Sequence, residues 1–107
     1  MKRFLLLLIT IFSCNILFAQ SYITGKITNS KGETVPFASI QINKTKEGVS
    51  ADENGKYQLK TSLTGNLKLV ASSTGFISVN KSIIITKNNK NYTQNFVLKE
   101  FAEVLNE

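Results

Sequence analysis

The chain has 107 residues, 13 lysines and arginines against seven acidic residues, no histidine and a single cysteine, Cys14. Without imidazole, serine–histidine and cysteine–histidine catalysis are excluded, and so are the common histidine sites for zinc, copper or iron. The net charge of +6 comes mainly from lysines scattered singly along the chain, so we expect no nucleic-acid partner.

The first 19 residues have the pattern of a secretory signal peptide. Lys2 and Arg3 form a positive start, an apolar run covers residues 4–18, and the small residue Ala19 follows. We expect cleavage after Ala19, which would discard Cys14 and leave residues 20–107. The apolar run is shorter than the roughly 20 residues that a spanning helix needs, so we expect no membrane span in the mature chain.

After the signal peptide, apolar and polar residues alternate with period two, and turn residues interrupt the pattern every eight to twelve positions or so. This spacing predicts an all-β, antiparallel β-sandwich of seven strands over one core. A chain of this size can bury such a core without disulfides. In chain order, the predicted strands lie within residues 22–28, 36–43, 49–51, 56–61, 67–72, 77–85 and 92–98.

Three of these predicted strands carry further detail. Pro36 has no N–H to donate, so it starts the second strand or lies on an edge. Residues 77–85 make the longest predicted strand, in which Lys81 falls on the inward side and is expected near a sheet edge. Residues 101–107, beyond the last strand, are short and polar enough to be a tail.

The acidic turn between the third and fourth strands is the first candidate for chemistry. Asp52 and Asn54 precede Gly55, but a calcium loop would need a glutamate at its twelfth position, where Leu63 stands. Asp52 and Glu53 are neighbours on a turn and cannot enclose a substrate as paired catalytic carboxylates do. We therefore predict a plain β-turn, no catalytic, metal-ligating or cofactor-binding residue, and no enzymatic activity.

Aromatic side chains are the second candidate, because exposed rings can form a platform for a carbohydrate. Aromatic residues at period two in strands are usually core residues. Phe101 follows the last predicted strand and is the one most expected to be exposed. The set considered is Tyr22, Tyr57, Phe76, Tyr92, Phe96 and Phe101.

The turn residues match a known family. Residues 32–40 (GETVPFASI), Gly48, residues 52–57 (DENGKY) and residues 73–76 (STGF) occur in the order found in carboxypeptidase regulatory-like domains, which this chain resembles. The resemblance implies a transthyretin-like, immunoglobulin-like sandwich over residues 20–98. The chain departs from the family at Phe37, where glycine is usual.

The residues after the last strand extend the resemblance. Residues 98–107 (LKEFAEVLNE) look like the segment that links such a domain to the TonB box and plug of TonB-dependent outer-membrane receptors. In those receptors the domain is an N-terminal periplasmic extension. We expect residues 99–107 to be a linker or tail, and the chain to be either a fragment of a receptor gene or a protein that stands alone.

The function expected from this resemblance is that of a non-catalytic periplasmic accessory domain of, or derived from, a TonB-dependent receptor in a Gram-negative bacterium. Its expected partners are envelope proteins, either components of the TonB system or the receptor's own plug and barrel. The alternative is a free-standing secreted or surface module that binds carbohydrate or protein. A third hypothesis, assistance to a peptidase, would need a separate zinc catalytic domain.

Overall fold

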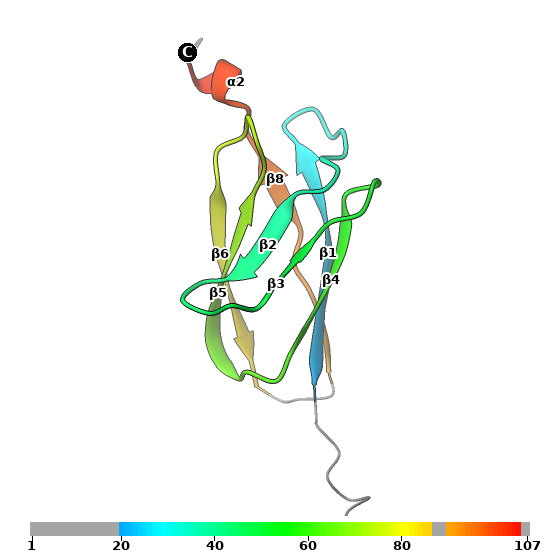
Figure 1. Ribbon diagram of the computed structural model, residues 1–107, viewed down its shortest axis with the longest axis vertical. Coiled ribbons are helices and arrows are strands. Elements are labelled where there is room, and N and C mark those ends of the chain that lie inside the picture. The colour runs from blue at the N-terminus through cyan, green and yellow to red at the C-terminus, as the bar shows by residue number, and fades with distance from the viewer. Residues whose placement is uncertain (1–19, 87–89, 106–107) are drawn as a thin grey trace, which may run out of the picture.

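The structure, a computed structural model, describes residues 20–86 and 90–105. The predicted signal peptide, residues 1–19, lies outside the described residues, as do residues 87–89 of the predicted turn before the last strand. Two sheets pack face to face over one core, and a short helix follows the last strand (Figure 1).

The first sheet is built around β1 (Ser21–Asn29). Along one side β1 pairs antiparallel with β4 (Lys56–Thr61), with Ile23 opposite Leu59. Its other side is shared by β7 (Asn91–Thr93) and β8 (Phe96–Leu98), and both run parallel to β1.

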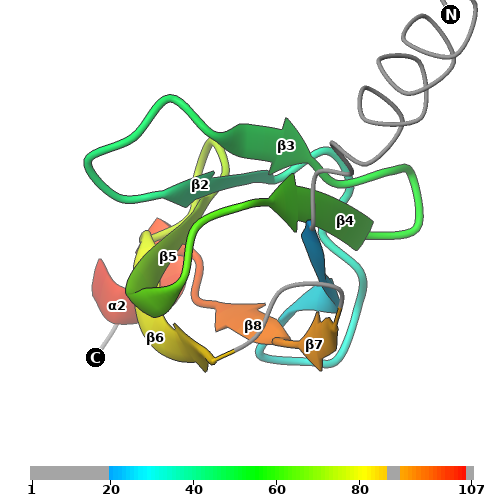
Figure 2. The same cartoon turned by 90° about the horizontal axis from the view of Figure 1, so that it is seen from below.

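The second sheet has the order β3, β2, β5, β6 and is antiparallel throughout. Its strands are β2 (Ser39–Ile42), β3 (Gly48–Ser50), β5 (Gly65–Ser72) and β6 (Val79–Ile85). Seen from below, the two sheets nearly enclose the interior between them (Figure 2).

The core follows from the alternation of residues along the strands. In β4, for example, Tyr57, Leu59 and Thr61 are buried while the residues between them are exposed. Each large apolar side chain buried in this way stabilises the fold by roughly 1.5–3 kcal/mol. The largest fully buried apolar side chains are Phe96, Ile23, Ile27, Ile40, Ile42, Leu69, Ile85 and Leu98.

The two sheets meet at a seam between β6 and the β7–β8 segment. Lys81 Nζ donates to the Asn95 carbonyl oxygen at 3.2 Å, and the Thr86 N–H donates to the Tyr92 hydroxyl oxygen at 3.2 Å. Lys81 lies on β6, the edge strand of the second sheet, and is paired with Leu69 of β5. This confirms its predicted position near a sheet edge.

The predicted class, an all-β sandwich, is confirmed, and the second sheet is antiparallel as predicted. The first sheet is mixed, because β7 and β8 run parallel to β1, and the last predicted strand divides in two. At the division, the Gln94 N–H donates to the Thr24 carbonyl oxygen at 2.8 Å, and the Lys26 N–H donates to Asn95 Oδ1 at 2.9 Å. The described residues therefore contain eight strands where seven were predicted. Alternation alone did not reveal the break, because β7 and β8 continue along the same side of β1.

Other strand boundaries also differ from prediction. Pro36 and Phe37 form a turn, so the second strand begins later, at Ser39. Strand β6 begins at Val79 because Ile77 instead donates its N–H to the Lys99 carbonyl oxygen at 2.8 Å. The longest strand is β1, with nine residues, not β6.

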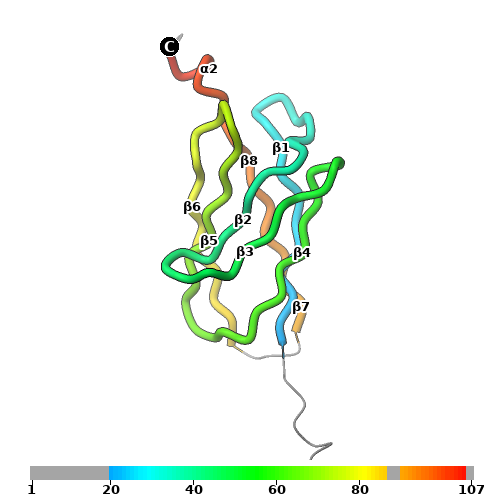
Figure 3. The backbone as a smooth tube through the Cα atoms, viewed as in Figure 1, coloured from blue at the N-terminus to red at the C-terminus, as the bar shows by residue number. Residues whose placement is uncertain are grey.

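The residues after β8 lie against the β5–β6 connection. Glu100 forms an isolated antiparallel bridge with Phe76, and the Phe101 N–H donates to the Gly75 carbonyl oxygen at 3.1 Å. A one-turn helix, α2 (Phe101–Leu105), follows where a tail was predicted. In the backbone trace this helix lies at the end of the sandwich opposite the start of β1 (Figure 3).

Candidate interaction surface

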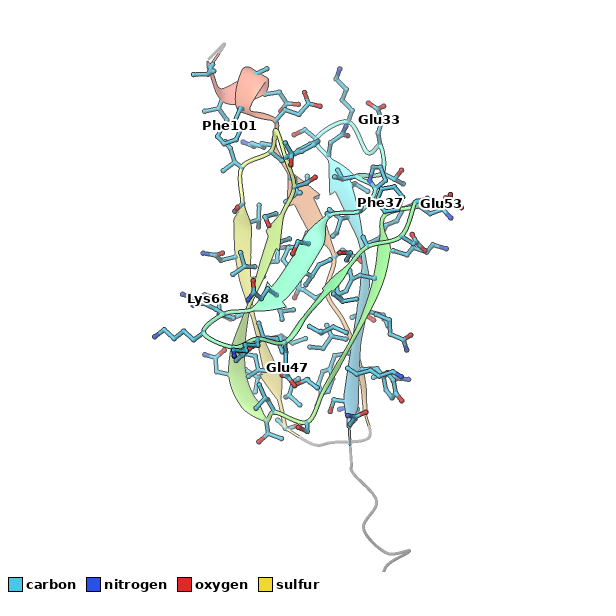
Figure 4. The ribbon with its side chains drawn as sticks, in the orientation of Figure 1. Glu33, Phe37, Glu47, Glu53, Lys68 and Phe101 are labelled. Atoms are coloured by element: carbon cyan, nitrogen blue, oxygen red, sulfur yellow. The ribbon has the colours of Figure 1, made fainter. Side chains whose placement is uncertain are left out.

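Several connections and α2 gather at one end of the sandwich, which we call the C-terminal pole. It consists of residues 30–37, residues 52–55, residues 73–77 and α2. Figure 4 shows Glu33, Phe37, Glu53 and Phe101 at this end, Lys68 about midway along the sandwich, and Glu47 nearer the other end. Loops at one end of a sandwich are where such folds commonly place binding residues.

The turn that contains Asp52 uses its carboxylate to hold its own backbone. Asp52 Oδ1 accepts the N–H groups of Asn54 at 2.8 Å and Lys56 at 2.9 Å. These backbone hydrogen bonds lower the pKa of the Asp52 carboxyl group. Gly55 has φ +76, and a Cβ there would lie 2.7 Å from the Ile27 carbonyl oxygen, so this turn requires glycine.

Nothing in the described part of the chain gathers three or more histidine, cysteine, aspartate or glutamate side chains that could hold a metal ion. Within residues 20–86 and 90–105, no helix has the length and apolar character needed to cross a membrane.

Phe37 has the most unusual backbone at the C-terminal pole. Its φ is +59, and its side chain is 69% exposed, although its neighbour Ala38 is only 1% exposed. Its N–H donates to the Asp52 carbonyl oxygen at 3.2 Å, which ties it to the neighbouring turn. A bulky residue in this left-handed region costs on the order of 1–3 kcal/mol, and the surrounding structure must offset that cost.

A shallow depression lies beside Phe37. It has a volume of about 430 Å³ and is lined by Phe37, Ser39, Ser72, Ser73 and Thr74. Ser39 on β2 stands directly opposite Ser72 on β5, so their side chains share the outer face of the sheet. The lining combines one aromatic ring with four hydroxyl groups and carries no charge.

A second depression, of about 350 Å³, lies where β3 and β4 diverge and includes Lys46, Glu47 and Lys60 in its lining. Glu47 Oε2 accepts the hydroxyl of Thr61 at 2.9 Å, and Thr61 Oγ1 accepts the N–H of Leu63 at 3.0 Å. These bonds satisfy Thr61, which is 1% exposed, and they give Glu47 a structural role.

The aromatic residues considered as a platform lie mainly in or against the core. Tyr57 and Phe96 are buried, with ring centroids 6.2 Å apart, and Phe76 and Tyr92 pack against the core. Phe101 is 54% exposed, in agreement with its predicted position beyond the strands.

Phe37 was absent from that set, although its ring is more exposed than that of Phe101. Two signals in the sequence could have found it. Phe37 follows a proline, and it occupies a position where the family that the chain resembles usually has glycine.

The two packed sheets define the chain as a small immunoglobulin-like β-sandwich. Residues 23–107 match the CarboxypepD_reg-like domain family, and the chain belongs to this family. It is 38% identical over 72 residues to a TonB-dependent receptor of Formosa agariphila; this stretch covers 67% of the chain but 7% of that receptor. The chain thus corresponds to a small part of that receptor's length.

Solved structures share the fold at low sequence identity. A chain of a type II cohesin–X-dockerin complex from Acetivibrio cellulolyticus has a TM-score of 0.60 at 12% identity, covering 75% of this chain and 58% of that one. Catechol 1,2-dioxygenase from Acinetobacter sp. ADP1 has a TM-score of 0.63 at 10% identity, covering 80% and 54%. A protein of unknown function from Bacteroides fragilis has a TM-score of 0.52 at 21% identity, covering 77% and 28%. These likenesses concern the fold alone.

Proposed function

We propose that this chain is a non-catalytic accessory domain of, or derived from, a TonB-dependent outer-membrane receptor, and that it works in the periplasm. The similarity to a TonB-dependent receptor supports this proposal. The observation that carries it is the path of the chain, because β1 starts at one end of the sandwich and α2 lies at the other (Figure 1). In such a receptor, the end of the sandwich that carries α2 would face the plug, and the start of β1 would point away from it.

Because hydrogen bonds attach the C-terminal segment to the sandwich, this segment would link the domain mechanically to the plug. Besides the bonds to Gly75 and Ile77, Ser30 Oγ donates to Glu103 Oε2 at 3.0 Å. These contacts set the direction in which the chain leaves the domain.

Helix α2 also presents an apolar patch to solvent. Phe101 is 54% exposed, Val104 42% and Leu105 83%, and we call these three residues the α2 patch. In a receptor, the α2 patch would pack against the next domain, with the plug and barrel or a TonB-system protein as the partner. Exposed apolar side chains grouped on one element are typical of such contacts.

Site-specific cross-linking in cells tests this function. A photo-reactive amino acid replaces Leu105 in the chain produced in its native envelope, and mass spectrometry identifies the product. The matched control places the same group at Lys68, which is exposed about midway along the sandwich and away from α2 (Figure 4). We expect a receptor plug, barrel or TonB-system protein from position 105 only; equal products from both positions, or none, would contradict the proposal.

The DNA sequence beyond the codon for Glu107 separates this proposal from a free-standing binding module. A plug and barrel, in frame or after a frameshift, would support the receptor domain. A true stop codon followed by unrelated sequence would support the free-standing module, which the depression beside Phe37 also favours.

A further inference from the structure

We propose that the depression beside Phe37 is a subsite for one ring of a neutral carbohydrate. The inference goes beyond the receptor-domain function and does not depend on it, since every residue involved lies within the sandwich.

Phe37 has a backbone conformation that a bulky side chain disfavours. Its φ of +59 is one that glycine adopts freely and that a bulky side chain adopts only at a cost. The ring does not recover that cost in the core, because it is 69% exposed while Val35 and Ala38 on either side are buried. Folding therefore does not explain a phenylalanine here, whereas a ligand that covers the ring would.

The walls of the depression beside Phe37 carry four hydroxyl groups. Hydroxyl groups can both donate and accept hydrogen bonds, as can the hydroxyls of a sugar. Ser39 and Ser72 stand opposite each other, and Ser73 and Thr74 continue the row beyond β5. The Phe37 ring can cover the C–H face of a sugar ring, while the hydroxyl groups beside it can bond to the hydroxyls of the sugar.

The charge of the sheet face around the depression favours a neutral ligand. The outer face of the β3-β2-β5-β6 sheet continues from the depression with uncharged side chains, namely Gln41, Ser50, Asn80 and Ser82. Among the outward-facing residues of these strands only Lys68 is charged, and it lies away from Phe37 (Figure 4). The outer face of β1 and β4 is different, because Lys26 and Lys56 stand directly opposite each other there.

An acidic glycan or acidic peptide would therefore prefer the lysine-bearing face of β1 and β4. A neutral oligosaccharide has no such preference, and it fits the face where an aromatic ring and hydroxyl groups are combined. A neutral protein segment remains as an outcome of the test.

The test uses ¹⁵N-labelled residues 20–107, which include every core residue of the sandwich. Cellohexaose, xylohexaose and mannohexaose are added separately, and amide chemical shifts are followed by NMR. At least one of them should shift the amides of Phe37, Ser39 and residues 72–74 with saturation. The Phe37→Gly variant keeps the backbone geometry, removes the ring and should weaken binding about tenfold or more.

Lys44→Gly is the matched control. Lys44 is exposed and has φ +67, so it has the same backbone class as Phe37 but lies at the other end of β2. Binding by this variant should equal that of the unchanged chain. Phe37→Asn, which also tolerates a left-handed backbone, serves if the glycine variant does not fold.

The proposal is overturned if none of the three oligosaccharides shifts these amides, or if removal of the ring leaves affinity unchanged. It is also overturned if Lys44→Gly weakens binding as much as Phe37→Gly, or if polygalacturonate binds this face as tightly as the neutral sugars do. If no sugar binds and the Phe37→Gly variant loses a contact with a protein, the face would be assigned to a protein partner instead.

Discussion

Gly25 and Phe37 differ in how far the surrounding structure restricts which residue can occupy the position. At Gly25, in the middle of β1, a Cβ would lie 1.9 Å from the Gln94 carbonyl oxygen and 2.8 Å from Tyr57 Cε1, so only glycine fits. At Phe37 the backbone has a conformation that favours glycine, yet a large exposed ring is present. Packing dictates the first residue, and neither packing nor backbone preference dictates the second.

The difference shows where stability is made and where a binding role is to be sought. Around Gly25, the Tyr57 hydroxyl donates to the Gln94 carbonyl oxygen and the Tyr57 ring packs near that of Phe96. The Tyr57 hydroxyl and ring therefore both have partners within the fold. The Phe37 ring has solvent where a partner would be, so substitutions in the two regions should act in opposite directions.

The largest effect is expected from Gly25→Ala. The added Cβ would force β1 away from the β7–β8 segment, because the atom that it meets first is backbone oxygen. We expect a loss of about 3 kcal/mol in the free energy of unfolding, measured with urea. Gly32→Ala is the control, since a Cβ there meets nothing within 4 Å although φ is +83, and it should cost about 1 kcal/mol. Equal losses would mean that close packing at Gly25 is not decisive.

Tyr57→Phe should have the next largest effect. It removes the donor to the Gln94 carbonyl oxygen and leaves that acceptor without its side-chain partner. We expect the free energy of unfolding to fall by about 1–2 kcal/mol at neutral pH, measured with urea. An unchanged value would show that water replaces the hydroxyl group at no cost.

The burial of the Tyr57 hydroxyl should also make the stability of the fold depend on pH. Burial raises the pKa of the Tyr57 hydroxyl above its usual value of 10.0. The unfolded chain then releases this proton before the folded chain does, so stability is fully present below about pH 10 and falls as the pH rises further. Urea unfolding at several alkaline pH values should show a steeper decline in the unchanged chain than in Tyr57→Phe.

A smaller effect, of the opposite pH sign, is expected at Asp52. Backbone hydrogen bonds from Lys56 and Asn54 lower the pKa of this carboxyl group. Its contribution to stability is therefore present above the pKa of the unfolded chain and is lost as the pH falls through the lowered value. Asp52→Asn should flatten the acid side of the stability profile, as followed by circular dichroism; an unchanged profile would contradict this role.

The smallest effect, and the one with the opposite direction, is expected from Phe37→Gly. Relief of the left-handed backbone should exceed the entropic cost of glycine, which gives a gain of about 0.5–1 kcal/mol. Thermal unfolding should therefore move upward by a few degrees. A clear loss of stability would show that the ring packs into the fold, and the contrast with Gly25 would disappear.

The class of fold and much of its core could be predicted from alternation. In β2, Ile40 and Ile42 are buried while Ser39 and Gln41 are exposed, as period two predicts. The Asp52 turn was also predicted from its residue types, because its hydrogen bonds are local. The alternation in β2 and the Asp52 turn both depend on residues close together in the chain, so both can be predicted from the sequence.

The division of the last strand was not predictable in the same way. β7 and β8 are separated because Gln94 and Asn95 bond to Thr24 and Lys26, which lie about seventy positions earlier in the chain. Parallel pairing with β1 likewise joins the first and last strands, and no local pattern reports it. The same holds for the residues before α2, whose backbone partners lie at Gly75 and Ile77.

An all-β sandwich and the sides of most strands that face the core could be predicted from side-chain polarity and turn chemistry, which act over a few residues. The family was predicted from the resemblance of the turn motifs to those of a known family. The exposure of Phe37 in a left-handed conformation, beside a row of hydroxyl groups from two strands, became apparent only from the folded chain. That arrangement depends on how β2 and β5 are brought side by side, and hydrogen bonds between distant segments bring them together.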